Sequence, residues 1–247
     1  MHNRTALVIG GATGIGRSIA MQLVADGHTV IVADIDEKVS HTYANYPQVS
    51  IYILDVSNAL AVEHFCEEIQ QNITTLHVIV YTVGITKKLD FQDVGYALWQ
   101  KTFAINLSGV FYCMKYLDPI IKNSRGISII LIGSGSSLTG SGGGVQYYSS
   151  KGGMIGMMRY FVHAYESIHA KVNVIAPRVI QSQILDHLYP TEQARESLLN
   201  KIPVGRIGTG NDIATLVQYL CSDAGSYING QVLLLDGGRT YSSKKHD

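Results

Sequence analysis

The sequence predicts one α/β domain, a doubly wound sheet of seven parallel strands with helices on both faces. Three observations lead to this fold class. The chain has 247 residues, of which 46% are apolar, so it can bury one large core. Short apolar runs rich in β-branched residues alternate with longer segments of helical periodicity. Composition hardly changes along the chain, and no linker or repeat interrupts it, so we predict a single domain over residues 1–247.

Each predicted strand is a short run with few polar side chains. These runs are Ala6 to Ile9, Thr29 to Ala33, Ser50 to Leu54, His77 to Tyr81, Ser128 to Ile132, Lys171 to Ile175 and Gln231 to Leu235. The helical segments between them are Gly16 to Asp26, Ala59 to Gln71, Leu107 to Asn123, Ser149 to Ser167 and Asp212 to Cys221. Strands that alternate with helices pair in parallel, because right-handed crossovers place the helices on the faces of the sheet. Ligands of such sheets bind beyond the carboxyl ends of the strands, so functional residues are expected directly after strands.

Composition excludes several classes of function. Nineteen basic residues balance nineteen acidic ones, so there is no excess of positive charge of the kind that binds nucleic acid or an anionic membrane. No apolar run approaches the ~20 residues of a membrane span. Three separated cysteines and the absence of an export-type segment at the start lead us to expect a soluble cytoplasmic protein. The nine histidines show no metal-binding spacing, so no metal site is expected.

A glycine-rich turn follows the first strand and opens the first predicted helix. Glycines permit a tight turn and let the backbone approach a pyrophosphate, whose charge the free N–H groups and the helix dipole stabilise. This placement predicts a Rossmann-like dinucleotide site, and a glycine-rich turn without a ligand is the alternative. The expected contacts are Gly10, Thr13, Gly14, Ile15 and Gly16.

Asp34 follows the second strand, where this fold places an acid against the ribose hydroxyls. Its carboxylate would repel a 2′-phosphate, and neither Thr13 nor Ile35 is basic, so NAD is expected rather than NADP. A turn acid or a helix cap is the alternative. Asp55 and Val56, after the third strand, are expected near the adenine, and for Asp55 a capping role is the alternative.

A hydroxyl-rich loop follows the fifth predicted strand. Ser134 lies in it, and Tyr147 and Lys151 come later at a spacing that puts both on one helix face. This spacing alone carries no information, since Tyr241 and Lys245 repeat it in the polar tail. The position of Tyr147 after a glycine-rich stretch, thirteen residues beyond Ser134, singles it out as a candidate functional residue.

Taken together, the motifs resemble the short-chain dehydrogenase/reductase family over essentially the whole chain. They are, in order, GGATGIG from Gly10, Asp34, DV at Asp55, Asn106 in AINLSGVF, I-G-S at Ser134, YYSSK from Tyr147, VNVIAP ending at Pro177 with Ile180 and Ser182 after it, PVGRIG from Pro203, and SYINGQVLLLDGG near the C-terminus.

The resemblance implies a catalytic set of Asn106, Ser134, Tyr147 and Lys151. Tyr147 would exchange a proton with the substrate oxygen while hydride passes between substrate and nicotinamide. The pKa of a free tyrosine is about 10, so positive charge from Lys151 and the oxidised nicotinamide must lower it. Ser134 would hydrogen-bond the substrate oxygen, or it is a plain turn serine. Lys151 would also bind the nicotinamide ribose.

Other roles also rest on the resemblance. Asn106 would hold a water that passes protons to solvent, and a helix-kinking or capping asparagine is the alternative. Further implied cofactor contacts are Gly84, Tyr147, Lys151, Pro177, Ile180 and Ser182. The helices after Asn106 and after Tyr147 commonly pair subunits in this family, so a homotetramer or dimer is expected.

Three places depart from the family pattern. Ile9 stands where threonine is usual. Tyr81-Thr82-Val83-Gly84 replaces Asn-Asn-Ala-Gly, which bears on the adenine-side fit and on strand hydrogen bonding. Arg178 replaces a glycine after Pro177, and it either binds an anionic substrate group or lies at the surface or in a structural ion pair.

Two segments are expected to shape the substrate pocket: the small-residue loop 136–146 and a short helical lid at about 183–206. The expected reaction is NAD-dependent interconversion of a secondary alcohol and a ketone, the substrate being a sugar, polyol, cyclic alcohol or hydroxy acid. One alternative is NADPH-dependent reduction of 3-oxoacyl thioesters. Another is a catalytically silent dinucleotide-binding relative, which the altered segment after the fourth strand favours.

Overall fold

The computed structural model describes residues 4–182, 185 and 189–243 and has the predicted seven-stranded parallel sheet. The strand order is β3-β2-β1-β4-β5-β6-β7, and every neighbouring pair is parallel. The strands are β1 (Thr5–Ile9), β2 (Thr29–Asp34), β3 (Val49–Ile53), β4 (Val78–Tyr81), β5 (Ser128–Ile132), β6 (Lys171–Pro177) and β7 (Val232–Leu235). The chain order reverses between β1 and β4, so the fold is doubly wound, as predicted.

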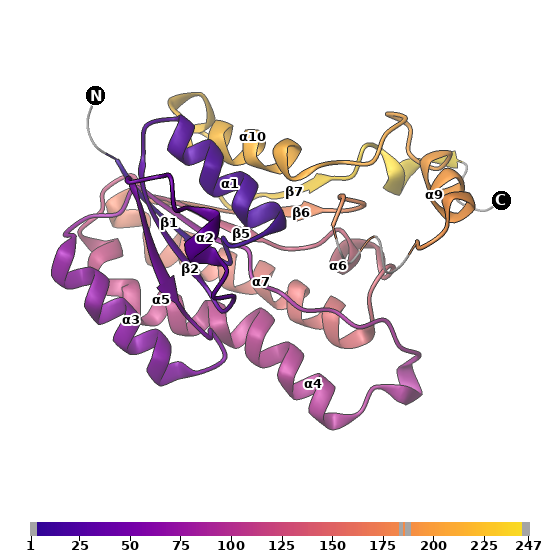
Figure 1. Ribbon diagram of the computed structural model, residues 1–247, viewed down its shortest axis with the longest axis horizontal. Coiled ribbons are helices and arrows are strands. Elements are labelled where there is room, and N and C mark those ends of the chain that lie inside the picture. Colours follow the sequence, from indigo (N-terminus) through magenta and orange to yellow (C-terminus); the bar gives the residue numbers. More distant parts are fainter. Residues whose placement is uncertain (1–3, 183–184, 186–188, 244–247) are drawn as a thin grey trace.

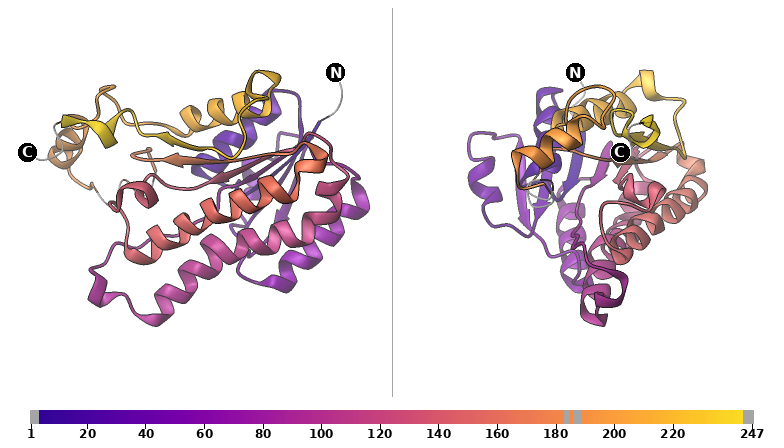
Figure 2. Two further views of the ribbon diagram at one scale, coloured as in Figure 1. Left: turned by 180° about the vertical axis from the view of Figure 1, so that it is seen from behind. Right: turned by 90° about the vertical axis from the view of Figure 1, so that its right-hand side faces the viewer.

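Helices cover both faces of the sheet. On one side lie α1 (Gly14–Ala25) and α10 (Gly210–Cys221), and on the other α3 (Ala59–Asn72), α5 (Gly109–Lys122) and α7 (Val145–Ala164) (Figures 1 and 2). The other helices with bounds in the described part of the chain are α2 (Val39–Thr42), α4 (Tyr96–Phe103), α6 (Ser136–Thr139) and α9 (Glu192–Leu199). Short 3-10 turns are η1 (Phe91–Asp93), η3 (Glu166–Ile168), η4 (Asp223–Gly225) and η5 (Arg239–Tyr241), and η2 (Ala104–Ser108) is a π-helix.

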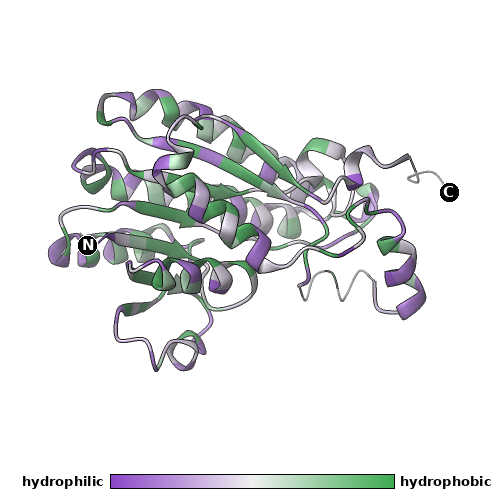
Figure 3. Ribbon diagram, turned by 90° about the horizontal axis from the view of Figure 1, so that it is seen from above, coloured by the Kyte–Doolittle hydropathy of each residue, from purple (hydrophilic) through white to green (hydrophobic). Residues whose placement is uncertain are grey.

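Two apolar clusters fill the space between the sheet and its helices. Side chains alternate along each strand, so Leu7 belongs to the cluster under α3, α5 and α7, while Val8 belongs to the one under α1 and α10. Both residues are fully buried. The sheet appears as a hydrophobic layer between amphipathic helices in Figure 3. Because both faces are covered, the strands read as nearly continuous apolar runs.

The helix before β5 is longer than the sequence predicts. We expect it to start at Leu107, but α4 begins at Tyr96 and continues through the π-helix into α5. With only eight residues α4 is too short to be stable as an isolated helix, and its packing on α7 decides that it is helical. Likewise α7 begins at Val145, ahead of the predicted Ser149.

The carboxyl ends of the strands meet at one end of the sheet, where α6, α9 and η5 also gather (Figure 1). The described part of residues 183–206 contains α9, in agreement with a short helical segment, while residues 183–184 and 186–188 lie outside the described residues. Leu185, Leu198 and Ile202 form a small apolar cluster there. None of the described helices is long and apolar enough to cross a membrane.

Candidate active site

A cavity of about 410 Å³ opens at the carboxyl ends of β5 and β6. Its walls come from the loops after β4, β5 and β6 and from α7 and η5. Ser134, Tyr147 and Lys151 all line it, together with Gly84, Pro177, Ile180 and Ser182. The cavity therefore brings together the predicted catalytic residues on β5 and α7 and several of the predicted cofactor contacts.

Tyr147 and Ser134 are joined by a hydrogen bond between their side chains. Ser134 is 6% exposed, and its hydroxyl also accepts a hydrogen bond from the N–H of Ser136, so the serine rotamer is fixed. Burial raises the pKa of Tyr147, and the bond with Ser134 opposes that rise. Both residues line the cavity, so a substrate oxygen bound there could contact both hydroxyls.

Lys151 is fully enclosed beside this pair. Its ammonium donates to the carbonyl oxygens of Ile132 (2.9 Å) and Val83 (3.2 Å). Burial lowers the pKa of Lys151 to about 7. The sequence predicts that Lys151 lowers the pKa of Tyr147, but in the protein alone the shift of Tyr147 is upward. The lowering stays a prediction for the complex with oxidised nicotinamide.

Asn106 lies in the π-helix between α4 and α5 and is completely buried. Its side-chain carbonyl accepts from the N–H of Ile85 (2.8 Å), and its amide donates to the carbonyl of Ile85 (3.0 Å) and to the hydroxyl of Ser150 (3.0 Å). Asn106 thus ties the loop after β4 to α7 next to Lys151. Single turns of π-helix are frequent at functional sites, because they turn one side chain out of the regular helix.

The glycine-rich turn forms a cradle that fits a pyrophosphate. A Cβ at Gly16 would collide with the carbonyl oxygen of Gly10, and one at Gly10 would collide with the Thr82 hydroxyl, so only glycine fits at either position. Gly14 has φ of +54° and open space around it. No side chain of the described residues caps the amino end of α1 after Thr13, which leaves its N–H groups directed at the cradle.

Asp34 closes the same turn. Its carboxylate accepts hydrogen bonds from the N–H groups of Ala12 (2.8 Å) and Asp36 (3.0 Å). A carboxylate has about four acceptor positions, so two remain for ribose hydroxyls. Arg17 and Asp34 act in opposite directions on the pKa of Tyr43, so both lie near this phenol. Arg17 is therefore a cation near the expected ribose site that the sequence argument did not consider.

The other predicted cofactor residues are placed as follows. A Cβ at Gly84 would lie 2.9 Å from the Lys151 amine, so glycine permits this approach. Asp55 accepts from the N–H and the hydroxyl of Ser57, which makes it a turn acid, and Asn58 caps α3 instead. Val56 is buried in the core. Ile35 is 64% exposed beside Asp34, as a contact to a bound nucleoside would be.

Two arginines stand on the cavity wall. Arg178, half-buried after β6, donates to the hydroxyls of Ser141 (2.5 Å) and Thr240 (3.1 Å), and no described carboxylate pairs with it. Arg239, in η5, also lines the cavity, and its buried Nε has no hydrogen-bond partner among the described residues. Sequence reasoning missed Arg239, although its position just after β7 is where this fold gathers functional residues.

Among the described residues, no three His, Cys, Asp or Glu side chains come together in a way that could hold a metal ion. Cys66, Cys113 and Cys221 are unpaired and buried.

Comparison with known proteins agrees with this geometry. A family model described as enoyl-(acyl carrier protein) reductase matches residues 10–240. The chain belongs to the short-chain dehydrogenase/reductase family. It is an oxidoreductase of that family.

Relatives within the short-chain dehydrogenase/reductase family are similar over their full length. The chain is 30% identical over 243 residues to the 3-oxoacyl-[acyl-carrier-protein] reductase FabG of Thermotoga maritima, covering 96% of this chain and 98% of that one. It is 32% identical over 241 residues to FabG of Staphylococcus aureus, covering 95% and 97%. The Pseudomonas aeruginosa RhlG/NADP active-site complex is 28% identical with a TM-score of 0.89, covering 96% of both chains.

The departure of Tyr81-Thr82-Val83 from the short-chain dehydrogenase/reductase pattern leaves strand bonding intact. The Thr82 N–H donates to the carbonyl of Ile9 (2.8 Å), and its hydroxyl lies 2.8 Å from the carbonyl oxygen of Gly10. The Tyr81 hydroxyl donates to the carbonyl of Ile105 at the π-helix (2.7 Å). The altered segment thus has hydrogen bonds to the cradle and to the π-helix, which weighs against reading it as the sign of a silent relative.

Proposed function

We propose that the protein interconverts a 3-oxoacyl compound and its 3-hydroxy form with a nicotinamide dinucleotide as hydride carrier. The observation that carries the proposal is the hydrogen-bonded pair Tyr147 and Ser134 in a cavity with the buried Lys151. Support for the substrate class comes from the two similar 3-oxoacyl-[acyl-carrier-protein] reductases. These two relatives favour this substrate class over the sugars, polyols, cyclic alcohols and hydroxy acids that we first expect.

Each residue has a defined task in this proposal. When bound, the nicotinamide supplies a hydride in reduction and accepts it in oxidation. Ser134 hydrogen-bonds the carbonyl oxygen of the substrate and polarises it. Tyr147 gives that oxygen a proton, so one hydride and one proton convert the ketone to a secondary alcohol. In oxidation Tyr147 takes the proton back.

Lys151 and Asn106 support the phenol. Lys151, when protonated, would supply positive charge next to Tyr147. We also assign it to the nicotinamide ribose, because its side chain lines the cavity and Gly84 has no Cβ that would crowd the amine. Asn106 keeps the loop after β4 in contact with α7, and through Ser150 it fixes the turn of α7 that carries both Tyr147 and Lys151. The proposal also includes a water molecule, held by Asn106, that passes protons between Lys151 and solvent.

A phenylalanine at position 147 tests the chemistry. We expect Tyr147→Phe to lower kcat at least 100-fold for reduction of the N-acetylcysteamine thioester of 3-oxobutanoate, because proton transfer contributes about 10²–10⁴. Cofactor binding, followed by fluorescence of the reduced nicotinamide, should stay nearly unchanged. Tyr160→Phe, an exposed position on the same helix, serves as the control. A Tyr147→Phe protein with full activity would contradict the assignment.

We propose NAD(H) as the cofactor, with Asp34 binding the adenosine ribose. The two acceptor positions left on its carboxylate suit two ribose hydroxyls, and its charge opposes a 2′-phosphate. Two observations favour NADP(H) instead: the similar RhlG was solved with NADP, and the cation Arg17 lies near the expected ribose site.

The ratio of kcat/KM for NADH over NADPH tests the cofactor. We expect NADH to be preferred, and Asp34→Ser to lower that preference at least tenfold. Asp36→Ser, which removes a neighbouring half-buried carboxylate, should change it by less than threefold. Preference of the unaltered protein for NADPH would overturn the role of Asp34.

A homotetramer or dimer remains part of the proposal. Exposed aromatic side chains stand on α4, α5 and α7, namely Tyr96, Phe111 and Tyr160. Light scattering of the eluting protein measures its mass directly. The lid function of residues 183–206 and a cytoplasmic location also stay predictions.

A further inference from the structure

We propose that Arg178 and Arg239 bind a carboxylate of the substrate, so that the protein acts on an oxo acid or hydroxy acid. The inference rests on the proposed function, since it concerns the second end of the substrate that Tyr147 and Ser134 hold at its carbonyl. It names a binding site that the reaction itself does not require.

The guanidinium group of Arg178 is held in a fixed orientation next to Ser134. A Cβ at Gly135 would lie 2.9 Å from the Cβ of Arg178, so the arginine stem packs directly on the residue after Ser134. Its two terminal nitrogens donate to the Ser141 and Thr240 hydroxyls. Each of these nitrogens carries two hydrogens, and Nε carries one, so donors remain for a ligand.

The cavity wall carries positive charge only. Lys88, Lys151, Arg178 and Arg239 line it, and none of the described lining residues is Asp or Glu. Burial lowers the pKa of Arg178, and the neighbouring Arg239 lowers it further. Two guanidinium groups that line one cavity and repel each other without a paired anion are costly, and a bound anion would remove that cost.

Asp236 is the described carboxylate whose charge acts on Arg178. It does not pair with either arginine. Its two oxygens accept from the N–H groups of Gly238 (2.9 Å) and Thr240 (2.6 Å), so it shapes the turn that presents Arg239. The arginine pair therefore keeps unsatisfied donors, as the buried Nε of Arg239 illustrates.

A carboxylate fits this pair better than a larger group. The flat fork of a guanidinium matches the two oxygens of a carboxylate. The same cavity must also take the nicotinamide, since Pro177, Ile180 and Ser182 border it, and this leaves room for a short acid. Ser134 and Arg178 come from neighbouring strand ends, so the carbonyl and the carboxylate of a short oxo acid can reach both.

Matched acids and esters test the site. In reduction assays, 3-oxobutanoate and 4-oxopentanoate are each compared with their methyl esters, which keep the ketone and lose the charge. The N-acetylcysteamine thioester of 3-oxobutanoate reports the proposed function independently of a carboxylate. The variants are Arg178→Met and Arg239→Met, which keep an apolar stem. The control is Lys101→Met, which removes an exposed cation on α4 that does not line the cavity.

We expect the better acid to exceed its ester at least tenfold in kcat/KM. Either arginine variant should lower kcat/KM for the acid by about 10- to 100-fold, as for a lost charge-assisted bond, and for ester and thioester by less than threefold. Lys101→Met should change all three by less than threefold. Acid and ester used equally well, or equal losses for both in the arginine variants, would overturn the carboxylate site while leaving the proposed function standing.

A calorimetric titration covers the case in which no acid is reduced. Each acid is titrated into the protein with NAD⁺ present, which cannot reduce it, and inorganic phosphate is titrated separately. Binding of an acid that Arg178→Met abolishes supports the site, and the proposed reaction then fails on its own. The carboxylate site is overturned if neither acid binds detectably. It is also overturned if phosphate binds as strongly as the acids and loses its binding equally in Arg178→Met.

Discussion

Lys151 is a buried amine whose described partners are two backbone carbonyls and a methionine sulfur. Enclosure of a charge costs free energy, and this is why the pKa of Lys151 falls to about 7. In the unfolded chain the pKa of lysine is about 10.4. Between these values the unfolded state binds more protons, so Lys151 makes stability rise with pH from about 7 upward, and its full cost is present below pH 7.

Lys151→Met removes that dependence. We expect the free energy of unfolding of the original protein to rise relative to Lys151→Met by about 1–3 kcal/mol between pH 7 and pH 9.5. Guanidinium denaturation at the two pH values measures it, with the exposed Lys122→Met as control. A difference that does not change with pH would show that Lys151 keeps an ordinary pKa.

At the residue scale, the sequence predicts the site residues that lie at the end of a predicted strand or on one face of a predicted helix. Ser134, Tyr147 and Lys151 come together as expected, because a strand end and a helix face fix their positions. Ser141 lies in the loop 136–146, which we expect to shape the pocket, and it lines the cavity. Arg239 escapes prediction, because it reaches the cavity from η5 and no local pattern tells which way an arginine in a turn points.

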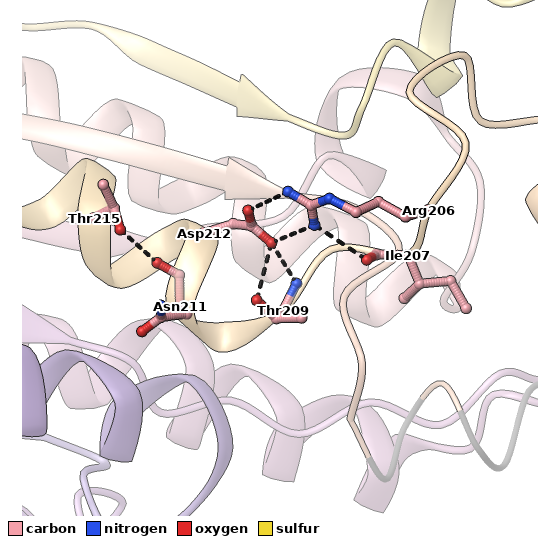
Figure 4. A network of polar contacts seen from close by, with 6 residues as sticks. All are labelled: Arg206, Ile207, Thr209, Asn211, Asp212 and Thr215. Carbon is pink, nitrogen blue, oxygen red and sulfur yellow. Dashed lines mark hydrogen bonds and ion pairs between the residues drawn. The ribbon is translucent and has the colours of Figure 1, made fainter.

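At the element scale, α10 shows how much a helix depends on its first turn. Thr209 and Asp212 form a reciprocal capping box, and Arg206 pairs with Asp212 through two bonds of 2.8 and 2.6 Å (Figure 4). The cap satisfies N–H groups that would otherwise lack partners. Arg206 and the Thr209 contacts hold the pKa of Asp212 far below its usual range.

Asp212→Ala removes this cap. We expect the free energy of unfolding to fall by about 1 kcal/mol at pH 7, the usual value of a lost cap. The difference should shrink as the pH falls below about 4, because the depressed pKa of Asp212 makes its stabilisation present above the unfolded pKa and lost toward acid. Asn211→Ala, an exposed neighbour, is the control for thermal denaturation. An equal loss in both variants would contradict the capping role.

The sequence predicts elements well where periodicity is strong and poorly where packing decides. All seven strands and α1, α3 and α10 lie within a few residues of their predicted bounds. The short α6 and the helix α4 are not predicted. The π-helix at Asn106 cannot be predicted from residue types, since it is defined by one extra residue in a turn rather than by any particular side chain.

At the scale of the whole molecule, both apolar clusters share one sheet. Leu117 on α5 and Ile213 on α10 are fully buried on opposite faces. Because each strand contributes side chains to both clusters, loss of packing on one face is expected to loosen the other.

We expect Leu117→Ala and Ile213→Ala each to lower the free energy of unfolding by about 2–5 kcal/mol within a single transition. Denaturation followed by far-ultraviolet circular dichroism and by fluorescence of Trp99 should give coincident curves. Two separated transitions in either variant would mean that the faces unfold independently and that the chain is not one domain. The cavity depends on both faces folding together, since its walls come from segments more than 100 residues apart in the sequence.

The π-helix has a consequence for engineering. Each residue of an α-helix rotates the chain by about 100° around the helix axis. A single extra residue therefore rotates everything beyond it by that angle. Deleting one residue between Ala104 and Ser108 would restore a regular rod from α4 to α5. The stacked rings of Trp99 and Phe103 would then swing around the rod, away from their present direction, while α5 stayed anchored on the sheet. The bulge thus sets the rotation of an outer helix relative to the core, and removing it would change the direction of α4 without any substitution within α4.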